Sequence, residues 1–110
     1  MKYILFIYIM EFPHPKKGQI TVYSKSGCIN CTKVKTLLKD KSLAFNIIDC
    51  DEFILDNKEE FLSFIQTIIG KEYRMFPMVF DNNKFIGGYN ETTKYFTSLQ
   101  EKLLDFDIFF

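Results

Sequence analysis

Two cysteines separated by two residues, Cys28 and Cys31, lie where a predicted strand gives way to a predicted helix. The strand pattern covers Gln19 to Tyr23, and the helix pattern starts near Ile29. A thiol at the start of a helix faces unpaired backbone N–H groups and the positive end of the helix dipole, and both favour the thiolate. Because the thiolate is the nucleophile of disulfide exchange, this position predicts a reactive cysteine.

The composition is that of an ordinary globular domain. The chain has 110 residues, of which 47% are hydrophobic and 25% charged, enough for one domain with one core. The formal net charge is zero, so we expect neither nucleic acid nor an anionic membrane as a partner. Three cysteines are an odd number, and they lack the spacing of a secreted disulfide framework. We therefore expect a reducing compartment, the cytoplasm, in which a CxxC pair is redox-active or binds metal.

The first residues form an apolar run. Tyr3–Met10 follows Lys2 and has about the length of a signal-peptide core, but no small-residue cleavage site follows it. The run is also far shorter than the ~20 residues that a membrane-spanning helix needs. We expect a β-rich extension that packs on the domain, with a secretory signal as the alternative. Pro13–Gly18 is linker-like, so residues 1–18 are assigned to an extension and linker, and residues 19–110 to the domain.

Apolar patterning predicts helices and strands in the order βαβαββα after the linker. The predicted strands are Gln19–Tyr23, Phe45–Ile48, Met78–Phe80 and Lys84–Ile86, the last two joined by a tight turn at 81–83. The first helix has Val34, Leu37 and Leu38 on one face. The second helix carries Phe61, Leu62, Ile65, Ile68 and Ile69 and ends at Gly70. The last helix, which Asn90 can N-cap, buries Tyr95, Phe96, Leu99 and Leu103.

This order indicates an α/β fold with a mixed sheet. Two strands joined by a helix are expected to be parallel, and the later hairpin adds antiparallel strands. Residues 49–51 have the composition of a turn. The aromatic tail, Asp105–Phe110, is expected to pack back on the surface or on a partner.

Three segments stand out in the chain: Tyr23–Cys31 (YSKSGCINC), Phe76-Pro77 before a strand, and Gly87–Asn90 (GGYN) before the last helix. Together they resemble the motifs of dithiol glutaredoxins. A CxxC alone is a weak signal, because zinc sites also use it, but the three motifs in this order are specific. The resemblance covers roughly Gln19 to Leu104 and implies a thioredoxin-like fold, in which a mixed four-stranded sheet is flanked by helices.

The resemblance assigns roles to the cysteines and to the residues near them. Cys28 is the nucleophile and Cys31 the resolving thiol. Lys25 stabilises the thiolate by its charge and pairs with a glutathione carboxylate, and a solvated loop lysine is the alternative. Pro77 is implied to be a cis proline facing the CxxC, so that the backbone of Phe76 binds the cysteinyl part of glutathione as a short extra strand. A trans proline that opens an edge strand is the alternative.

The glycine motif is implied to hold the other end of glutathione. Gly87 and Gly88 allow close backbone approach, and the start of the following helix is an anion site for the γ-glutamyl carboxylate. Tyr89 and Asn90 supply its N–H groups. An ordinary hairpin exit is the alternative interpretation of this motif.

Several positions depart from the family's usual pattern. Ile29-Asn30 replaces Pro-Tyr, which removes a constraint at the start of the helix and an aromatic wall beside the sulfur, and Asn30 is still assigned to the glutathione site. Met75-Phe76 replaces Thr-Val. Tyr73 replaces a Gln, and we expect neighbouring Arg74 to take over its carboxylate contact. Asn90 replaces an Asp that meets the ammonium group of the ligand. We therefore expect weaker or altered glutathione affinity with the chemistry retained.

The resemblance implies a monomeric, glutathione-dependent thiol–disulfide oxidoreductase that reduces protein–glutathione mixed disulfides and protein disulfides. A thioredoxin-like electron donor served by a reductase is the near alternative, although the chain has no Trp and no Trp-Cys-Gly-Pro-Cys signature. A proline-free CxxC also leaves open a binding function, in which Cys28 and glutathione hold an iron–sulfur cluster between two subunits. An inactive interaction module is disfavoured by the intact Cys28, Lys25 and Pro77.

Two further interpretations concern zinc and the third cysteine. A structural zinc site needs four ligands, and only Cys50 and His14 are available to complete the pair of Cys28 and Cys31. Cys50 itself is expected to be a semi-buried small hydrophobic residue. A regulatory or intermolecular disulfide is the alternative for Cys50.

Overall fold

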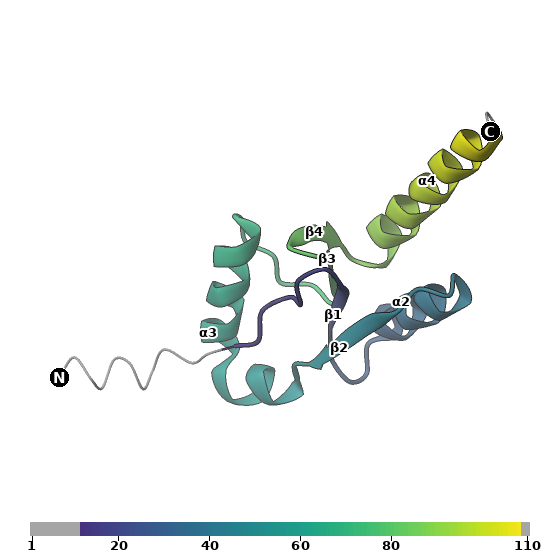
Figure 1. Ribbon diagram of the computed structural model, residues 1–110. Coiled ribbons are helices and arrows are strands. Elements are labelled where there is room, and N and C mark those ends of the chain that lie inside the picture. The colour runs from purple at the N-terminus through teal and green to yellow at the C-terminus, as the bar shows by residue number, and fades with distance from the viewer. Residues whose placement is uncertain (1–11, 109–110) are drawn as a thin grey trace.

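The computed structural model describes the backbone of residues 12–108 and the side chains of residues 12–100. The elements follow the predicted order (Figure 1). They are β1 (Ile20–Ser24), α2 (Ile29–Asp40), β2 (Phe45–Asp49), α3 (Asp51–Ile69), β3 (Met78–Asp81), β4 (Lys84–Gly87) and α4 (Tyr89–Ile108). Residues 1–11 of the predicted extension and linker (1–18), which include the apolar run, lie outside the described residues.

The strands form one mixed four-stranded sheet in the order β2-β1-β3-β4. The pair β1 and β2, joined by α2, is parallel, with Ile20 opposite Phe45. The pairs β1–β3 and β3–β4 are antiparallel. A two-residue turn at Asn82 and Asn83 joins β3 to β4, and Asn82 has the positive φ of +58° that this tight turn needs. The mixed sheet and the hairpin are therefore confirmed.

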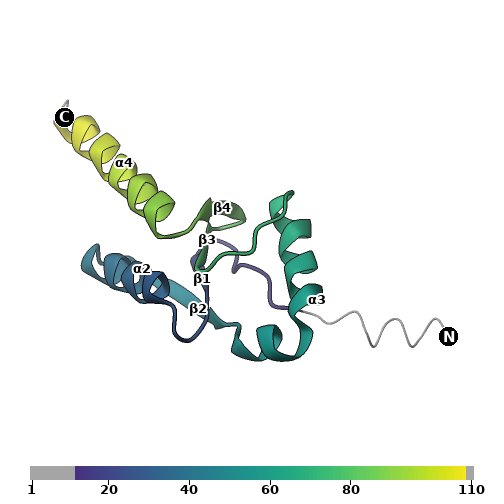
Figure 2. The same cartoon turned by 180° about the vertical axis from the view of Figure 1, so that it is seen from behind.

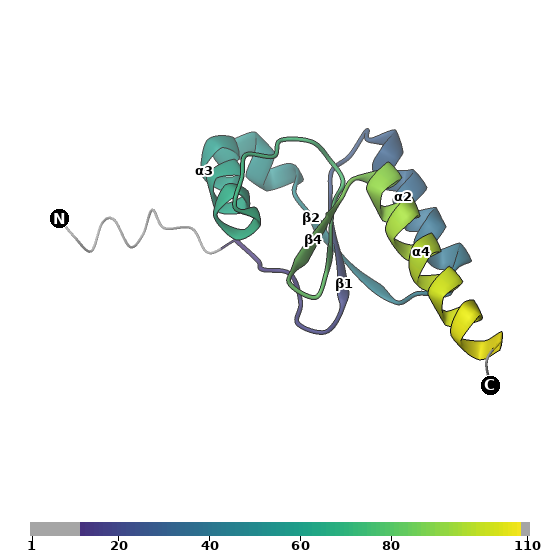
Figure 3. The ribbon, with the colours of Figure 1, turned by 90° about the horizontal axis from the view of Figure 1, so that it is seen from above.

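Helices cover both faces of the sheet. Seen from above, α3 lies on one side and α2 and α4 lie together on the other (Figure 3), and the view from behind shows the same pairing of α2 with α4 (Figure 2). Successive residues of a strand point to opposite faces, so β1 contributes to both layers. Val22 packs in the cluster on the α2 side with Val34 and Leu38, whereas Tyr23 packs on the α3 side with Phe61.

Two helix starts differ from the prediction. The segment 49–51 is not a free turn, because α3 begins at Asp51 and continues through a kink at Asn57, where φ is −142° and ψ is 45°. Asn90 is not an N-cap, because α4 begins at Tyr89 and the Thr92 N–H already donates to the Gly88 carbonyl oxygen at 3.0 Å. Asn90 therefore lies inside the first turn of α4.

The ends of the described chain pack in different ways. Phe12 is buried, and its ring contacts those of Phe53, Phe61 and Phe64 at centroid distances of 5.1 to 5.5 Å. The Tyr23 hydroxyl donates to the Pro13 carbonyl oxygen at 2.7 Å, so the first residue of the predicted linker lies against the domain. At the other end the backbone of α4 continues to Ile108, and the side chains of the predicted aromatic tail lie outside the described residues. Among the helices that the structure describes, none is long and apolar enough to cross a membrane.

Candidate active site

Cys28 caps the first turn of α2. Its backbone is extended, and its Sγ accepts the Cys31 N–H at 3.1 Å. Cys28 is half-buried, while Cys31 is only 1% exposed, so the first cysteine is the accessible one, as expected from its place before the helix. A sulfur that accepts a backbone N–H at the positive end of a helix has its thiolate form favoured once it is reduced.

The two cysteines are joined as a disulfide, with their Cα atoms 5.2 Å apart. That separation lies within the usual range for a disulfide, so the first turn of α2 accommodates the bond with ordinary backbone geometry. Ile29 and Asn30 lie between the sulfurs in sequence and are both exposed, Ile29 to 72%. The pair can therefore exist in the oxidised form that a dithiol exchange reaction produces.

The loop before β3 faces this pair. The Phe76–Pro77 peptide bond is cis, as the motif implies, and Pro77 is fully buried. The Cys28 Sγ lies 3.7 Å from the Phe76 carbonyl oxygen. The Phe76 ring stacks on Phe61 with an interplanar angle of 11°, and Lys25 Nζ lies 5.5 Å from the centre of the Phe76 ring. The structure thus brings together Lys25, Cys28, Phe76 and Pro77.

A carboxylate from α3 holds the loop that precedes Cys28. Asp51 accepts the Ser26 N–H at 2.8 Å and the Ser26 hydroxyl at 2.5 Å. These bonds, helped by the charges of Lys25 and Lys35, lower the pKa of Asp51. No role for Ser26 or Asp51 was evident from the sequence. The signal that could have found them is the parallel pairing of β1 and β2, which places the loops after both strands at the same edge of the sheet.

The glycine motif lies beside the proline loop. Gly87 has a φ of +132°, and a Cβ on Gly87 would lie 2.8 Å from the Glu91 Cβ. The Gly88 N–H donates to Glu91 Oε1 at 2.9 Å, and a Cβ on Gly88 would lie 3.7 Å from the Pro77 carbonyl oxygen. Tyr73 also lies here, and burial together with the Glu91 carboxylate raises its pKa. Sequence reasoning missed Glu91, which caps the helix through the N–H of Gly88.

The first turn of α4 offers backbone donors near this loop. The N–H groups of Tyr89 and Asn90 have no acceptor within the helix, as in any first helical turn. The Tyr89 ring is half-buried, with Lys33 Nζ 5.6 Å from its centre, and the Asn90 side chain is exposed. The positive end of the helix dipole favours an anion at this position.

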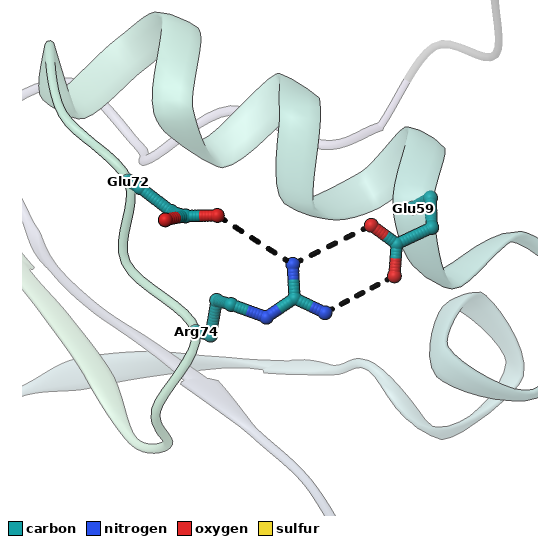
Figure 4. Close-up of polar contacts among 3 residues, drawn as sticks. All are labelled: Glu59, Glu72 and Arg74. Carbon is teal, nitrogen blue, oxygen red and sulfur yellow. Dashed lines mark hydrogen bonds and ion pairs between the residues drawn. The ribbon is translucent and has the colours of Figure 1, made fainter.

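Arg74 is engaged by carboxylates of the chain itself (Figure 4). Its two terminal nitrogens lie 3.1 and 3.4 Å from the two carboxylate oxygens of Glu59 on α3, and Nη1 lies 3.8 Å from Glu72 Oε2. The guanidinium lowers the pKa of Glu59, first through the hydrogen bond and then through its charge. Sequence reasoning assigned Arg74 to a ligand carboxylate and did not foresee these two partners.

An open cleft of about 500 Å³ lies on the other flank of Cys28. Its lining includes Lys25, Cys28, Thr32, Lys35 and Ile47, and it contains none of the residues of the proline loop or the glycine motif. Cys28 therefore lines this cleft and also contacts the loop of Phe76 through its sulfur.

The third cysteine and the histidine lie apart from the CxxC. Cys50 is free and fully buried, which agrees with a packing role, and burial raises the pKa of its thiol to about 12. His14 packs edge-on against Phe64, with ring centres 4.9 Å apart. Within residues 12–100 no three His, Cys, Asp or Glu side chains gather as a metal site.

The chain is similar to known redox proteins over most of the described domain. A family model described as Glutaredoxin matches residues 20–86. Hybrid peroxiredoxin hyPrx5 of Haemophilus influenzae is 35% identical over 83 residues, which are 76% of this chain and 31% of that protein. Glutaredoxin 1 of Rickettsia conorii is 35% identical over 63% of each chain. The glutaredoxin-like protein NrdH of Lactococcus lactis is 31% identical over 64% of this chain and 86% of its own length. The chain thus spans less than two thirds of the first two relatives.

Solved structures agree with the fold. Glutaredoxin 1 from Francisella tularensis superposes with a TM-score of 0.65 at 18% identity, covering 74% of this chain and 95% of that one. Oxidized glutaredoxin 2 from Chlamydomonas reinhardtii has a TM-score of 0.60 at 28% identity and covers 79% of each chain. The thioredoxin-like arrangement of sheet and helices is thereby confirmed.

Proposed function

Because the chain belongs to the glutaredoxin family, we propose that it is a glutathione-dependent thiol–disulfide oxidoreductase acting through Cys28 and Cys31. Its substrates are protein–glutathione mixed disulfides and protein disulfides. The observation that carries the proposal is the position of the Cys28 sulfur, which caps a helix and faces the Phe76 carbonyl oxygen across 3.7 Å. A reactive thiol therefore lies against a backbone edge that can pair with the extended backbone of glutathione.

The first step is attack on the mixed disulfide. The Cys28 thiolate attacks the glutathione sulfur, a Cys28–glutathione disulfide forms, and the original sulfur–sulfur bond breaks. The client protein leaves as a thiolate and takes a proton from water. The Cys31 N–H, which lies 3.1 Å from this sulfur in the disulfide form, would stabilise the thiolate before attack, and the charge of Lys25 would add to this effect.

The second step regenerates the enzyme by one of two routes. A second glutathione thiolate attacks the glutathione sulfur on Cys28, which releases oxidised glutathione and the Cys28 thiolate. Alternatively the Cys31 thiolate attacks Cys28 Sγ, releases glutathione and forms the disulfide seen in the structure, which two further glutathiones then reduce. Protein disulfides use the same chemistry, with Cys31 displacing the client from Cys28.

The contacts around Cys28 support a binding site for glutathione. The Phe76 backbone would hold the cysteinyl part, the first turn of α4 at Tyr89 and Asn90 would hold the γ-glutamyl carboxylate, and Lys25 and Arg74 would hold the glycyl carboxylate. Gly88 keeps the start of α4 close to the Pro77 carbonyl oxygen, as this arrangement requires. We further propose that the protein acts as a monomer in a reducing, cytoplasmic compartment.

The test is glutathione-coupled reduction of a mixed disulfide by the wild type, Cys28→Ser and Cys31→Ser. We expect Cys28→Ser to be inactive. If regeneration by a second glutathione suffices, Cys31→Ser retains activity. Activity that survives loss of Cys28 contradicts the proposal. Regeneration by a thioredoxin-type reductase and not by glutathione would instead support the electron-donor alternative.

A further inference from the structure

Arg74 lies close in sequence to the reactive centre, yet its guanidinium faces α3. It precedes Phe76 by two residues, and the Phe76 carbonyl oxygen lies 3.7 Å from the Cys28 sulfur. Glu59 meets it with both carboxylate oxygens, at 3.1 and 3.4 Å, and Glu72 approaches from the same loop at 3.8 Å (Figure 4). A cation that is expected to bind a ligand carboxylate is thus already bound by carboxylates of the chain.

The exposure of this ion pair shows that it contributes little to stability. The side chains of Arg74 and Glu59 are 44% and 71% exposed, and that of Glu72 is 70% exposed. Ion pairs in such positions are screened by water and are weak. The paired geometry of a guanidinium and a carboxylate is nevertheless the one that any other carboxylate would adopt. Glu59 can therefore be exchanged for a carboxylate from outside at little cost.

We infer that Glu59, with Glu72 as a weaker second partner, competes with the glycyl carboxylate of glutathione for Arg74 and so sets the affinity of the site for its substrate. This inference rests on the proposed function, because it takes glutathione as the ligand. Glu59 acts through Arg74 and is a specificity-determining residue without contact to the reacting sulfurs. A substrate without a carboxylate at this position leaves the ion pair in place and is not affected by it.

The size of the effect follows from competition. When a binding-competent state is only partly populated, the apparent dissociation constant rises by the inverse of that fraction. For an exposed ion pair of ordinary strength this factor is about threefold. The substrate and the transition state make the same contact with Arg74, so competition from Glu59 weakens both equally. The change is therefore expected in KM, with kcat unchanged.

The experiment compares three neutralising variants in full-length protein. Glu59→Gln removes the bidentate partner, Glu72→Gln removes the distant one, and Glu60→Gln is the control. Glu60 is the next residue of α3, is exposed, and is not a partner of Arg74. It therefore carries the same change in net charge without the change in contact. The substrate is the mixed disulfide of glutathione with a neutral thiol, compared with the same disulfide whose glycyl carboxylate is amidated.

We expect Glu59→Gln to lower KM about threefold at constant kcat, Glu72→Gln to lower it less, and Glu60→Gln to leave it unchanged. With the amidated substrate Glu59→Gln has no effect. An unchanged or raised KM in Glu59→Gln overturns the inference, and a raised KM shows instead that the ion pair positions the loop. Equal effects of Glu59→Gln and Glu60→Gln overturn it as well. These results leave the proposed function intact if the wild type turns over the disulfide, whereas an inactive wild type overturns both.

Discussion

The sulfur of Cys28 lies 3.7 Å from the carbonyl oxygen of Phe76, although the two residues are 48 positions apart in sequence. This contact joins the start of α2 to the cis-proline loop before β3. It places the more exposed cysteine of the pair beside the backbone of that loop, where the proposed function expects an extended peptide substrate to bind.

The first prediction concerns Asn90. Asn90→Asp is expected to tighten glutathione binding about fivefold, because a hydrogen bond to the ligand's ammonium is stronger from a carboxylate than from an amide. A calorimetric or NMR titration with glutathione measures the change. Asn83→Asp, an exposed position in the β3–β4 turn, adds the same charge as a control. No gain in Asn90→Asp, or an equal gain in both variants, contradicts the assignment of Asn90 to the site.

The second prediction concerns the hold of Asp51 on the loop before Cys28. Because its two bonds from Ser26 lower the pKa of Asp51, the ionised carboxylate stabilises the folded state above the unfolded pKa of about 3.9. This contribution is lost as the pH falls through the lowered pKa of the folded state. Urea unfolding should therefore show Asp51→Asn to be less stable than the wild type at pH 7, with a gap that closes on acidification. A gap that stays constant down to pH 2, or one of equal size in Asp56→Asn on the same helix, refutes this role.

The third prediction concerns Cys50. With its pKa raised to about 12 by burial, only about one thiol in ten thousand is ionised at pH 8, and the thiol is inaccessible as well. Alkylation of the reduced native protein should modify Cys28 and leave Cys50 unmodified until urea is added. Mass spectrometry of the digested protein reads out each site. Labelling of Cys50 in the native protein at its unfolded rate would show that the thiol is available for a regulatory disulfide.

The fourth prediction concerns Gly87. Ala at this position must adopt a φ of +132° and place its Cβ 2.8 Å from that of Glu91, so Gly87→Ala should lower the free energy of unfolding by about 3 kcal/mol. Gly70 also has a positive φ, of +92°, but a Cβ there meets nothing within 4 Å, so Gly70→Ala should cost only about 1 kcal/mol. Chemical denaturation of both variants tests the difference. Equal losses contradict a special role for the contact between Gly87 and Glu91.

Most of the fold could be predicted because its elements follow local patterns. Short runs of β-branched and aromatic residues marked the strands, and the helical spacing of Val34 and Leu38 marked the buried face of α2. The early start of α3 could not be predicted, because the kink at Asn57 interrupts the helical period and Leu55 before it is 82% exposed. The start of α4 was misplaced because the side chain of Glu91, and not that of Asn90, accepts a backbone N–H at the N-terminus of the helix.

The candidate site could be predicted only where a short sequence motif specifies the local backbone geometry. The cysteine pair and the cis proline belong to such motifs. The bonds of Asp51 to Ser26 and of Glu59 to Arg74 join residues 25 and 15 positions apart. They depend on how α3 is oriented against the loops, and no periodicity in the sequence specifies that orientation.

The most direct test of the account follows the glutathione group itself. The Cys31→Ser variant is mixed with a glutathionylated peptide without added glutathione, and intact-mass and peptide mass spectrometry then locate the glutathione. We expect glutathione on Cys28 and release of the free peptide thiol, because in the proposed function glutathione pairs with the Phe76 backbone beside Cys28 and its sulfur is the one attacked. Capture of the peptide on Cys28 with release of glutathione, or an unmodified Cys28, would contradict the account.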